Sequence, residues 1–354
     1  MSKVHNYSAG PCILAQEVFT EASQSVLDFN GIGLSILEIS HRSKEFVAVM
    51  DEATALVKEI LDVPNNYDVV FLQGGASLGF AITAFNYLKT KGAYVDTGAW
   101  AAKSLKEAKK IGNVDLVASS ADKNYNFIPK GYSIPSDADY LHITSNNTIF
   151  GTQIKNLPDT NIPVICDMSS DIFSKKIDVS KFDMIYAGAQ KNLGPAGATL
   201  YIIKKGTLGK TDNNIPTMLN LETHIKKDSM YNTPPVFSVY VSMLTLRWLK
   251  KNGGIAWMED LNNQKAELLY NEIDRNSLFS GTANVEDRSN MNATFVLINE
   301  ALKEKFDAIW NDANISGIKG HRDVGGYRAS MYNALPLSSV QTLVDVMKEL
   351  EKTV

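Results

Sequence analysis

Residues 182–204, FDMIYAGAQKNLGPAGATLYIIK, decide the fold of this chain. Two apolar runs, 182–188 and 198–204, flank a single lysine, Lys191, which is set among alanines and glycines. Both runs are rich in β-branched and aromatic residues and are apolar at successive positions, which predicts strands buried on both faces. Lysine is among the residues least often buried, so a lysine between two such strands requires a chemical explanation.

Five similar apolar runs precede this stretch, at residues 68–72, 92–96, 114–118, 139–144 and 162–167. Segments with apolar residues at helical spacing lie before and between some of them, for instance residues 43–61 and 101–111. Strands that are buried on both faces and alternate with helices predict an α/β fold. We therefore expect a large domain built on a mainly parallel sheet of the seven-stranded type.

The pattern changes toward the end of the chain. Two long helices, two strands and a last helix are predicted there, at residues 236–251, 255–275, 293–298, 327–331 and from Ser338 onward. A capping signal from Ser338 to Gln341 is expected to open the last helix. We expect residues 16–259 to form the large domain, and residues 1–15 and 260–354 to form a smaller α+β domain.

Composition excludes several classes of function. The chain has 354 residues, of which 44% are hydrophobic and 21% charged, as in ordinary globular proteins. Its net charge of −4 favours binding neither to nucleic acid nor to anionic membrane. The two cysteines, Cys12 and Cys166, provide neither a disulfide framework nor a metal cluster, so no metal is expected. There is no apolar run of 18 residues and no signal peptide, which predicts a reduced, cytoplasmic protein.

Residues that could bind a ligand follow several of the predicted strands, at the edge where open α/β sheets hold their ligands. The first is the Gly74–Ser77 turn, whose small residues and following helix could bind a phosphate, although a tight turn is the alternative. Trp100 could pack in the core, Asp167 could cap a helix, and Lys191 could reach solvent. The Gly74–Ser77 turn matches neither a dinucleotide fingerprint nor a P-loop.

Considered together, these residues fit one ligand, pyridoxal 5′-phosphate (PLP). The phosphate would lie in the Gly74–Ser77 turn and the ring under Trp100. Asp167 would keep the pyridine nitrogen protonated, which the cofactor needs to act as an electron sink. Lys191, surrounded by small residues, would lose its proton readily and bind the aldehyde.

The chain also resembles a known family over residues 5–354. The stretches that carry the resemblance are NYSAGPCIL, LEISHRSKEF, IYAGAQKNLGPAG, NTPP, WLKKNGG, QKAELLY and GHRDVGGYRASMYNA. They are similar to the phosphoserine aminotransferase family, which belongs to the class V aminotransferases and to the fold-type I PLP enzymes. The resemblance implies a PLP-dependent aminotransferase.

What the resemblance implies for the cofactor can be stated residue by residue. Lys191 would hold PLP as the internal aldimine, with Asp167 and Trp100 as the other catalytic contacts. The remaining cofactor contacts would be Thr148 to the ring hydroxyl, Ala76, Ser77 and Gln190 to the phosphate, and Asn232 and Thr233 from the second subunit of a homodimer.

The substrate contacts that the resemblance implies are cationic. His41 and Arg42, together with His321 and Arg322, would bind the substrate phosphate, and Arg328 would bind the α-carboxylate. Arginine and histidine suit these contacts, because arginine pairs bidentately with carboxylate and phosphate and histidine adds a hydrogen-bond donor. The chain departs from many family members in having Ser77 where they have arginine, and Ala9 where some have serine. These departures bear on substrate affinity and leave the chemistry unaffected.

The reaction implied is a ping-pong transamination in serine biosynthesis. L-glutamate would become 2-oxoglutarate, and 3-phosphohydroxypyruvate would become O-phospho-L-serine, with Lys191 moving the proton. Some family members also make 4-phosphohydroxy-L-threonine in pyridoxine biosynthesis, and the sequence leaves that activity open.

Two other functions would fit parts of this sequence. A cysteine desulfurase or lyase needs an exposed loop thiolate, whereas Cys12 lies in an apolar stretch and Cys166 in a predicted strand. A nucleotide-binding module without a covalent cofactor would explain the glycine-rich turn but would leave Lys191 and Asp167 without roles.

Overall fold

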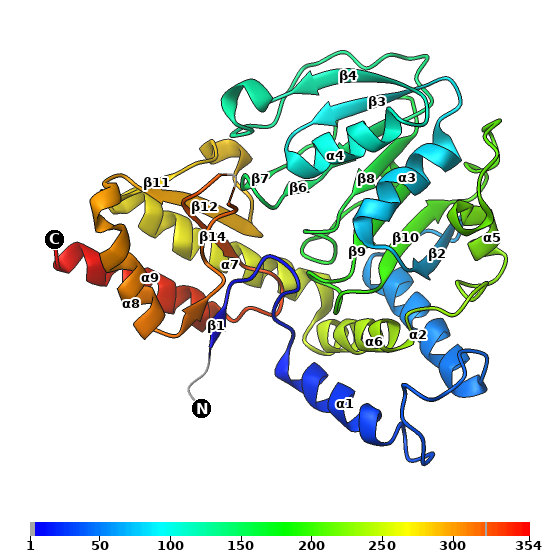
Figure 1. The fold of residues 1–354 in the computed structure, drawn as a ribbon, viewed down its shortest axis with the longest axis horizontal. Helices are drawn as coiled ribbons and strands as arrows, with labels where there is room; N and C mark the ends of the chain where they lie inside the picture. The colour runs from blue at the N-terminus through cyan, green and yellow to red at the C-terminus, as the bar shows by residue number, and fades with distance from the viewer. Residues whose placement is uncertain (1–3, 323) are drawn as a thin grey trace.

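The computed structural model describes residues 4–322 and 324–354. Its centre is a seven-stranded sheet in the larger part of the molecule (Figure 1). In spatial order the strands are β2 (Tyr67–Leu72), β10 (Thr199–Lys204), β9 (Met184–Gly188), β8 (Val164–Asp167), β5 (Leu141–Thr144), β3 (Lys91–Asp96) and β4 (Asn113–Ser119). All seven strands predicted for the large domain are present.

The sheet is mainly parallel, as predicted, with one exception. β10 runs antiparallel to both of its neighbours, β2 and β9. The strands β9, β8, β5, β3 and β4 are parallel to one another, so the carboxyl ends of β5, β8 and β9 meet at one edge. Thr144 pairs with Asp167, and Asp167 pairs with Tyr186, so their side chains share one face of the sheet.

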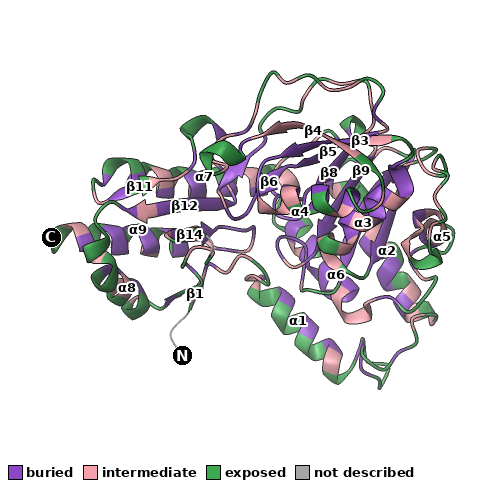
Figure 2. Cartoon of the chain, turned by 45° about the horizontal axis from the view of Figure 1, so that its top comes forward, coloured by how far each residue is buried: buried purple, intermediate pink, exposed green. Residues whose placement is uncertain are grey.

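Helices cover both faces of this sheet, which is why its strands are apolar at successive positions. One face packs against α3 (Gly75–Tyr87), α4 (Ala99–Ala108) and α5 (Leu221–Ile225). The other packs against α1 (Gln16–Leu27), α2 (Lys44–Ile60) and α6 (Val236–Lys251). Figure 2 shows most of the strands as a buried layer between these helices, whereas the edge strand β4 is only partly buried.

Two predicted helix starts were wrong. The sequence placed a helix after Ser77, but α3 begins at Gly75, so Ala76 and Ser77 lie in its first turn. The last helix, α9 (Leu337–Lys352), begins before the expected cap at Ser338. Pro336 is its N-cap, and the helix has no side-chain cap because a proline ring carries no acceptor atom.

A second apolar core lies in the smaller part of the molecule, at the left of Figure 1. It is built from α7 (Gly254–Arg275), β11 (Phe279–Gly281), β12 (Asn292–Leu297), α8 (Lys303–Asp312), β14 (Tyr327–Ser330) and α9. The short strands β1 (His5–Asn6) and β13 (Ile315–Ser316) pair beside it, and β6 (Asn146–Asn147) pairs with β7 (Thr152–Gln153) near the large sheet.

The two cores are separated along α7. Met258 near its start packs in the core of the large sheet, whereas Ala266 and Leu269 pack in the second core. The division at residues 259 and 260 remains a prediction, and residues 1–3 of the expected small domain lie outside the described residues.

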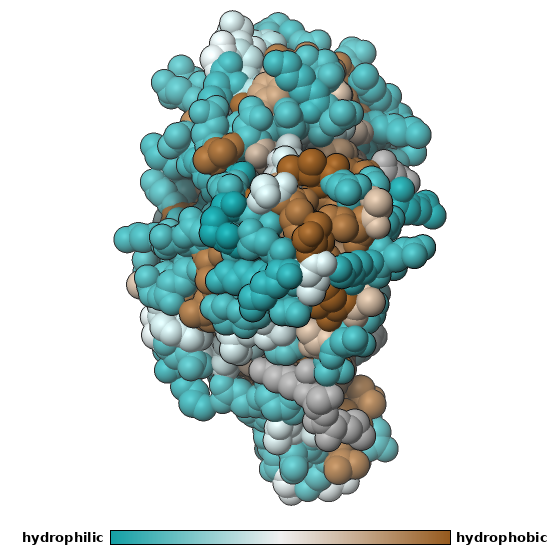
Figure 3. Space-filling view, turned by 90° about the vertical axis from the view of Figure 1, so that its left-hand side faces the viewer, coloured by the Kyte–Doolittle hydropathy of each residue, from teal (hydrophilic) through white to brown (hydrophobic). Residues whose placement is uncertain are grey.

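The surface of the molecule is mainly polar where Figure 3 shows it, at the end formed by the small core, with one apolar cluster near the middle of that face. None of the helices in the described ranges is long and apolar enough to cross a membrane.

Candidate functional site

Lys191 lies three residues beyond the end of β9, and its side chain is almost completely enclosed, with 9% of its surface exposed. Its Nζ donates a hydrogen bond to Thr148 Oγ1 at 2.9 Å. Burial lowers the pKa of Lys191 to about 8, and the charge of Arg328 adds to that effect while Asp167 opposes it. A lysine with this pKa is half deprotonated at about pH 8, so far more of it is the nucleophilic amine near neutral pH than for an ordinary lysine.

Asp167 ends β8 and is 4% exposed. Its Oδ1 accepts a hydrogen bond from the Ser169 amide at 2.9 Å, and no hydrogen bond to its other oxygen is found among the described residues. Burial raises the pKa of Asp167, whereas Ser169 and the charge of Lys191 lower it. Residues 168–178 form turns and no helix, so the helix cap considered from the sequence is wrong, and the Ser169 contact is a local turn that uses one carboxylate oxygen of Asp167.

The Gly74–Ser77 turn forms the start of α3. Gly74 has φ +106°, and a Cβ there would lie 2.3 Å from Leu78 Cδ2, so only glycine fits. The backbone N–H groups of Gly75, Ala76 and Ser77 lie in the first turn, where a helix has no carbonyl partners for them. Together with the helix dipole they form an anion site at this end of α3.

Asn232 and Thr233, expected at the phosphate of the partner subunit, are exposed residues before α6. The Thr233 carbonyl accepts a hydrogen bond from Gln73 Nε2 at 2.9 Å, so within one chain Thr233 contacts the residue that precedes the Gly74–Ser77 turn. Gln190, the other predicted phosphate contact, is partly buried next to Lys191.

Trp100 lies in the first turn of α4 and is partly buried. The Lys103 Nζ lies 4.3 Å from the centroid of the indole ring, a cation–π distance. The Trp100 Nε1 is buried and has no hydrogen-bond partner among the described residues. A buried donor without a partner is costly, and a polar ligand group could satisfy it.

Arg328 lies on β14 of the small core and is partly buried. Its Nε is buried and has no hydrogen-bond partner in the described part of the chain, and burial lowers the pKa of the Arg328 guanidinium. Because its charge acts on Lys191, the cation lies near the lysine amine. A carboxylate would satisfy the guanidinium and compensate for its burial.

The remaining predicted cations lie on two loops. His41 and Arg42 precede α2, whose N-cap is Ser43, and His41 Nε2 is buried without a partner while Arg42 is exposed. His321 is partly buried and Arg322 exposed, between β13 and β14.

The structure thus brings together Lys191, Thr148, Asp167 and Arg328. In residues 4–322 and 324–354, no hydrogen bond or ion pair joins the His41–Arg42 pair or the Asn232–Thr233 pair to Lys191 or Asp167.

Sequence reasoning assigned no role to a buried segment that supports Lys191. The thiol of Cys12 donates to the Lys191 carbonyl at 2.8 Å, and burial raises the pKa of that thiol to about 12. The Tyr332 hydroxyl donates to the Ala9 carbonyl at 2.9 Å. Lys265 is fully buried and its Nζ donates to the carbonyls of Met331 and Tyr332 at 3.0 and 2.9 Å.

Through these contacts residues 9–12 touch the backbone at Lys191 and the segment that follows β14, and that segment is in turn held by α7. Their sequence signals were the stretches NYSAGPCIL, QKAELLY and SMYNA, each of which was part of the resemblance. Cys166, the other thiol, is fully buried, so neither cysteine has the exposed position that a desulfurase nucleophile needs.

Comparisons of the sequence and of the structure with known proteins identify the same family. Residues 4–343 match the family model described as aminotransferase class-V. The chain is 65% identical over 355 residues to a phosphoserine aminotransferase of Flavobacterium psychrophilum, which covers 99% of this chain and 100% of the relative.

Solved structures agree with that similarity. Phosphoserine aminotransferase from Bacillus circulans subsp. alkalophilus superposes with a TM-score of 0.96 at 42% identity, over 99% of each chain. PLP-bound phosphoserine aminotransferase from Trichomonas vaginalis superposes with a TM-score of 0.93 at 34% identity, over 98% of this chain and 100% of that one.

Proposed function

The chain belongs to the class-V aminotransferase family, and from this premise we propose that it transfers the amino group of L-glutamate to 3-phosphohydroxypyruvate. The products are 2-oxoglutarate and O-phospho-L-serine, a step of serine biosynthesis. The proposal is supported by the relative that is 65% identical over the whole chain and carries the name of this activity. The observation that carries it within the structure is Lys191, a buried lysine of lowered pKa close to a buried aspartate.

The cofactor is pyridoxal 5′-phosphate, and the residues present fit it. Asp167 keeps one oxygen without a hydrogen bond in the described part of the chain, which suits a protonated ring nitrogen. The first turn of α3 offers backbone donors for the phosphate, and Trp100 offers an aromatic face. Thr148, already bonded to Lys191 Nζ, would hold the ring hydroxyl.

The bound cofactor supplies an electron sink that stabilises negative charge at the substrate α-carbon. Side chains of the protein would transfer the proton and hold the cofactor in its reactive charge state. Lys191 Nζ would accept the proton of the substrate α-carbon and later donate a proton, and its lowered pKa suits both transfers. The Asp167 carboxylate would stay ionised beside a protonated ring nitrogen, because that positive charge would offset the cost of burying the carboxylate.

Arg328 would hold the α-carboxylate that every substrate of this reaction carries. Its unpartnered Nε and its proximity to Lys191 support that role. We assign the phosphate end of the substrate to His41, Arg42, His321 and Arg322. Ser77 is exposed in the first turn of α3 and cannot replace the charge of the arginine that many relatives have there.

The active unit is proposed to be a homodimer in which Asn232 and Thr233 complete the phosphate site of the partner. Both residues are exposed and lie beside the residue that precedes the Gly74–Ser77 turn, so this surface is available to a second copy. We also propose the cytoplasm as the compartment, because both cysteines are free thiols.

Two measurements test the function. Borohydride reduction of the holoenzyme should bleach its yellow colour and attach the cofactor to the peptide that contains Lys191. Steady-state assays with L-glutamate should then compare 3-phosphohydroxypyruvate with 3-hydroxy-2-oxo-4-phosphonooxybutanoate, the corresponding substrate of pyridoxine synthesis. A labelled peptide without Lys191, or no turnover of the first oxoacid, would contradict the proposal.

A further inference from the structure

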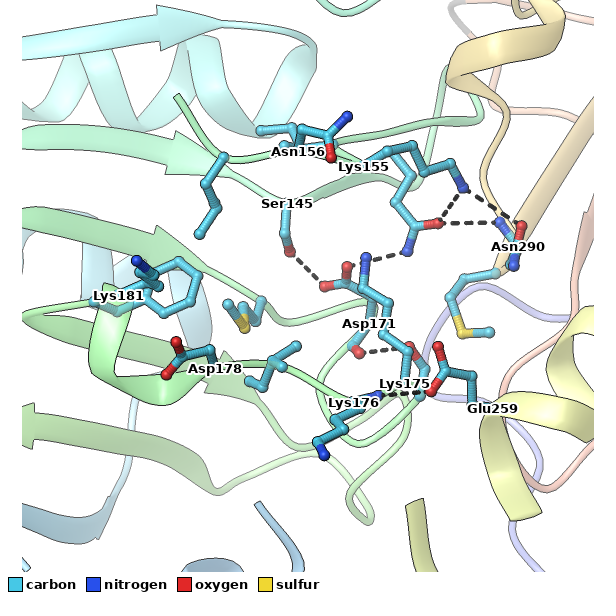
Figure 4. A pocket seen from close by; sticks show the side chains of 18 of the residues that line it. Ser145, Lys155, Asn156, Asp171, Lys175, Lys176, Asp178, Lys181, Glu259 and Asn290 are labelled. Carbon is cyan, nitrogen blue, oxygen red and sulfur yellow. Dashed lines mark hydrogen bonds between the residues drawn. The ribbon is translucent and has the colours of Figure 1, made fainter. Parts of the chain in front are cut away.

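A cavity of about 720 Å³ lies away from the candidate site, on the other side of the segment that follows β8. It is enclosed by residues 153–160, by residues 174–182 and by the first half of α7. Neither Lys191 nor Asp167 lines it. Figure 4 shows its interior, with Ser145 and Asp171 in the middle of the view. Its size is in the range of small-molecule sites in proteins.

Two lysines of the cavity, Lys155 and Lys175, form no ion pair among the described residues. Lys155 Nζ donates to Gln153 Oε1 at 2.9 Å and more weakly to Asn290 Oδ1 at 3.5 Å. Burial lowers the pKa of Lys155 to about 8, and the charge of Lys175 adds to that effect while the charges of Asp171 and Asp287 oppose it. Two ammonium groups that repel each other in a cavity favour an anionic ligand group between them.

A carboxylate lies on the α7 side of the same cavity. Glu259 accepts the Lys176 amide at 3.1 Å and forms no ion pair among the described residues. Its carboxylate has further acceptor positions with which a ligand ammonium group could pair. Asn262, one turn later on α7, is 1% exposed and its Oδ1 is fully buried, so that oxygen does not reach a ligand.

The rest of the wall is apolar. Ile154, Met168 and Phe182 line the cavity, and Met168 and Phe182 belong to the buried core on this face of the large sheet. The side of the cavity formed by Ser145, Gln153 and Asp171 is held in place by hydrogen bonds. The Ser145 hydroxyl donates to Asp171, and Gln153 Nε2 donates to the same carboxylate at 3.1 Å. The carboxylate of Asp171 is thus already satisfied and does not compete for a ligand.

The cavity therefore combines two lysines and a carboxylate without ion pairs among the described residues with an apolar wall. We propose that it binds a free amino acid with an apolar side chain, whose carboxylate pairs with Lys155 and Lys175 and whose ammonium group pairs with Glu259. A simple organic anion would leave the carboxylate of Glu259 unpaired, and a simple amine would leave the lysines unpaired.

Such a ligand is distinguishable from a substrate. The candidate site offers cations for a second anionic group, which an apolar amino acid lacks. The cavity offers apolar surface where the candidate site has charge. L-leucine is therefore a suitable probe, with 4-methylpentanoate as the analogue without the ammonium group and L-leucinamide as the analogue without the carboxylate.

The test is isothermal titration calorimetry of L-leucine into the PLP-loaded enzyme. L-leucine should bind, and each analogue should bind at least about tenfold more weakly, which corresponds to 1.4 kcal/mol for a lost charged contact. The variant K155M/K175M should lose leucine affinity by about tenfold or more and keep its aminotransferase activity. Lys58→Met, a change of an exposed lysine on α2 outside the cavity, should bind leucine as the unmodified enzyme does.

A third variant separates the cavity from the candidate site. Arg328→Ala should retain leucine binding, because Arg328 does not line the cavity. Three results would overturn the proposal: no heat of binding at millimolar leucine, equal affinity in K155M/K175M and the unmodified enzyme, or loss of leucine binding in Arg328→Ala.

Discussion

Lys191 Nζ lies 2.9 Å from Thr148 Oγ1, although the two residues are 43 positions apart in the chain. The lysine follows β9 and the threonine lies between β6 and β7, so the sheet edge brings them together. The hydrogen bond holds the amine in one orientation before the cofactor arrives. Ordering the side chain in advance lowers the entropy that must be lost when the cofactor binds.

Replacing Lys191 with alanine should abolish turnover and leave the fold intact. The change removes both the covalent anchor and the group that moves the proton, and general acid–base catalysis alone contributes about 10²–10⁴-fold. Steady-state assays and circular dichroism of the purified Lys191→Ala variant check the two halves of this expectation. Near-normal transamination by the variant would exclude the role given to Lys191.

The Asp167→Asn substitution keeps the size of the side chain and removes its charge. We expect a large fall in kcat with only a modest loss of folding stability, since asparagine can still accept the Ser169 amide through its side-chain oxygen. Measuring kcat and the free energy of urea unfolding for the same variant separates the loss of catalysis from the loss of stability. An unchanged kcat would mean that Asp167 acts only in the local turn with Ser169.

Stability of the apoenzyme should depend on pH through Lys191. Burial lowers its pKa to about 8 in the folded chain, against about 10.4 in an unfolded chain. Below about pH 8 the lysine is charged in both states, so the folded state bears the full cost of burying the charge. Between about pH 8 and 10.4 the unfolded state binds the proton that the folded state has released, so stability rises with pH.

The matched variant for this effect is Lys191→Met. At pH 7 the apo variant should be more stable than the unmodified apoenzyme by up to about 3 kcal/mol, because each pKa unit is worth 1.36 kcal/mol. This difference should shrink as the pH approaches 10. Urea unfolding of both apo proteins across that range measures it, and a difference that does not change with pH would argue against a lowered pKa.

Much of the fold could be predicted because it rests on burial. Strands covered on both faces are continuously apolar, as in β9 and β10, and such runs are visible in a sequence. Lys191 and Asp167 could be predicted as site residues because charged groups that follow these runs lie at the sheet edge.

Other features depend on contacts between distant residues, which a local pattern does not show. β11, with the sequence FSG, has weak strand propensity and pairs because β12 lies beside it. Lys265 is charged, which by itself predicts exposure, yet two backbone carbonyls allow it to be fully buried. The start of α3 was misplaced because glycine at Gly75 opposes helix formation locally, whereas packing of the later residues of α3 on the large sheet overrides it.

Sharing of the active site between subunits can be tested with two inactive parents, Lys191→Ala and N232A/T233A. If Asn232 and Thr233 act in the partner's site, a mixed dimer has one site with every residue intact. Refolding an equal mixture should then restore about a quarter of the wild-type activity, because half of the dimers are mixed and each has one working site of two. Mixed dimers without activity would show that each subunit builds its own site, as the contact between Gln73 and Thr233 within one chain would allow.

The last prediction concerns the phosphate of the substrate. Arg42 and Arg322 are assigned to the phosphate and Arg328 to the α-carboxylate. A substrate without a phosphate leaves the first group of cations unpaired, so serine and alanine should be poor amino donors. Glutamate is the exception, because its γ-carboxylate can pair with the same cations while Arg328 holds its α-carboxylate.

The arginine variants should therefore differ in a defined way. Arg42→Ala and Arg322→Ala should raise KM for phosphoserine, and also for glutamate, by about tenfold or more, since a charged hydrogen bond is worth about 1.5–3 kcal/mol and 1.4 kcal/mol is tenfold. Arg328→Ala should impair both half-reactions with every substrate, because each one has an α-carboxylate. Single-turnover measurements of the two half-reactions distinguish these patterns. Similar kcat/KM values for serine and phosphoserine in the unmodified enzyme would defeat the assignment, because the cations would then contribute nothing to the choice of substrate.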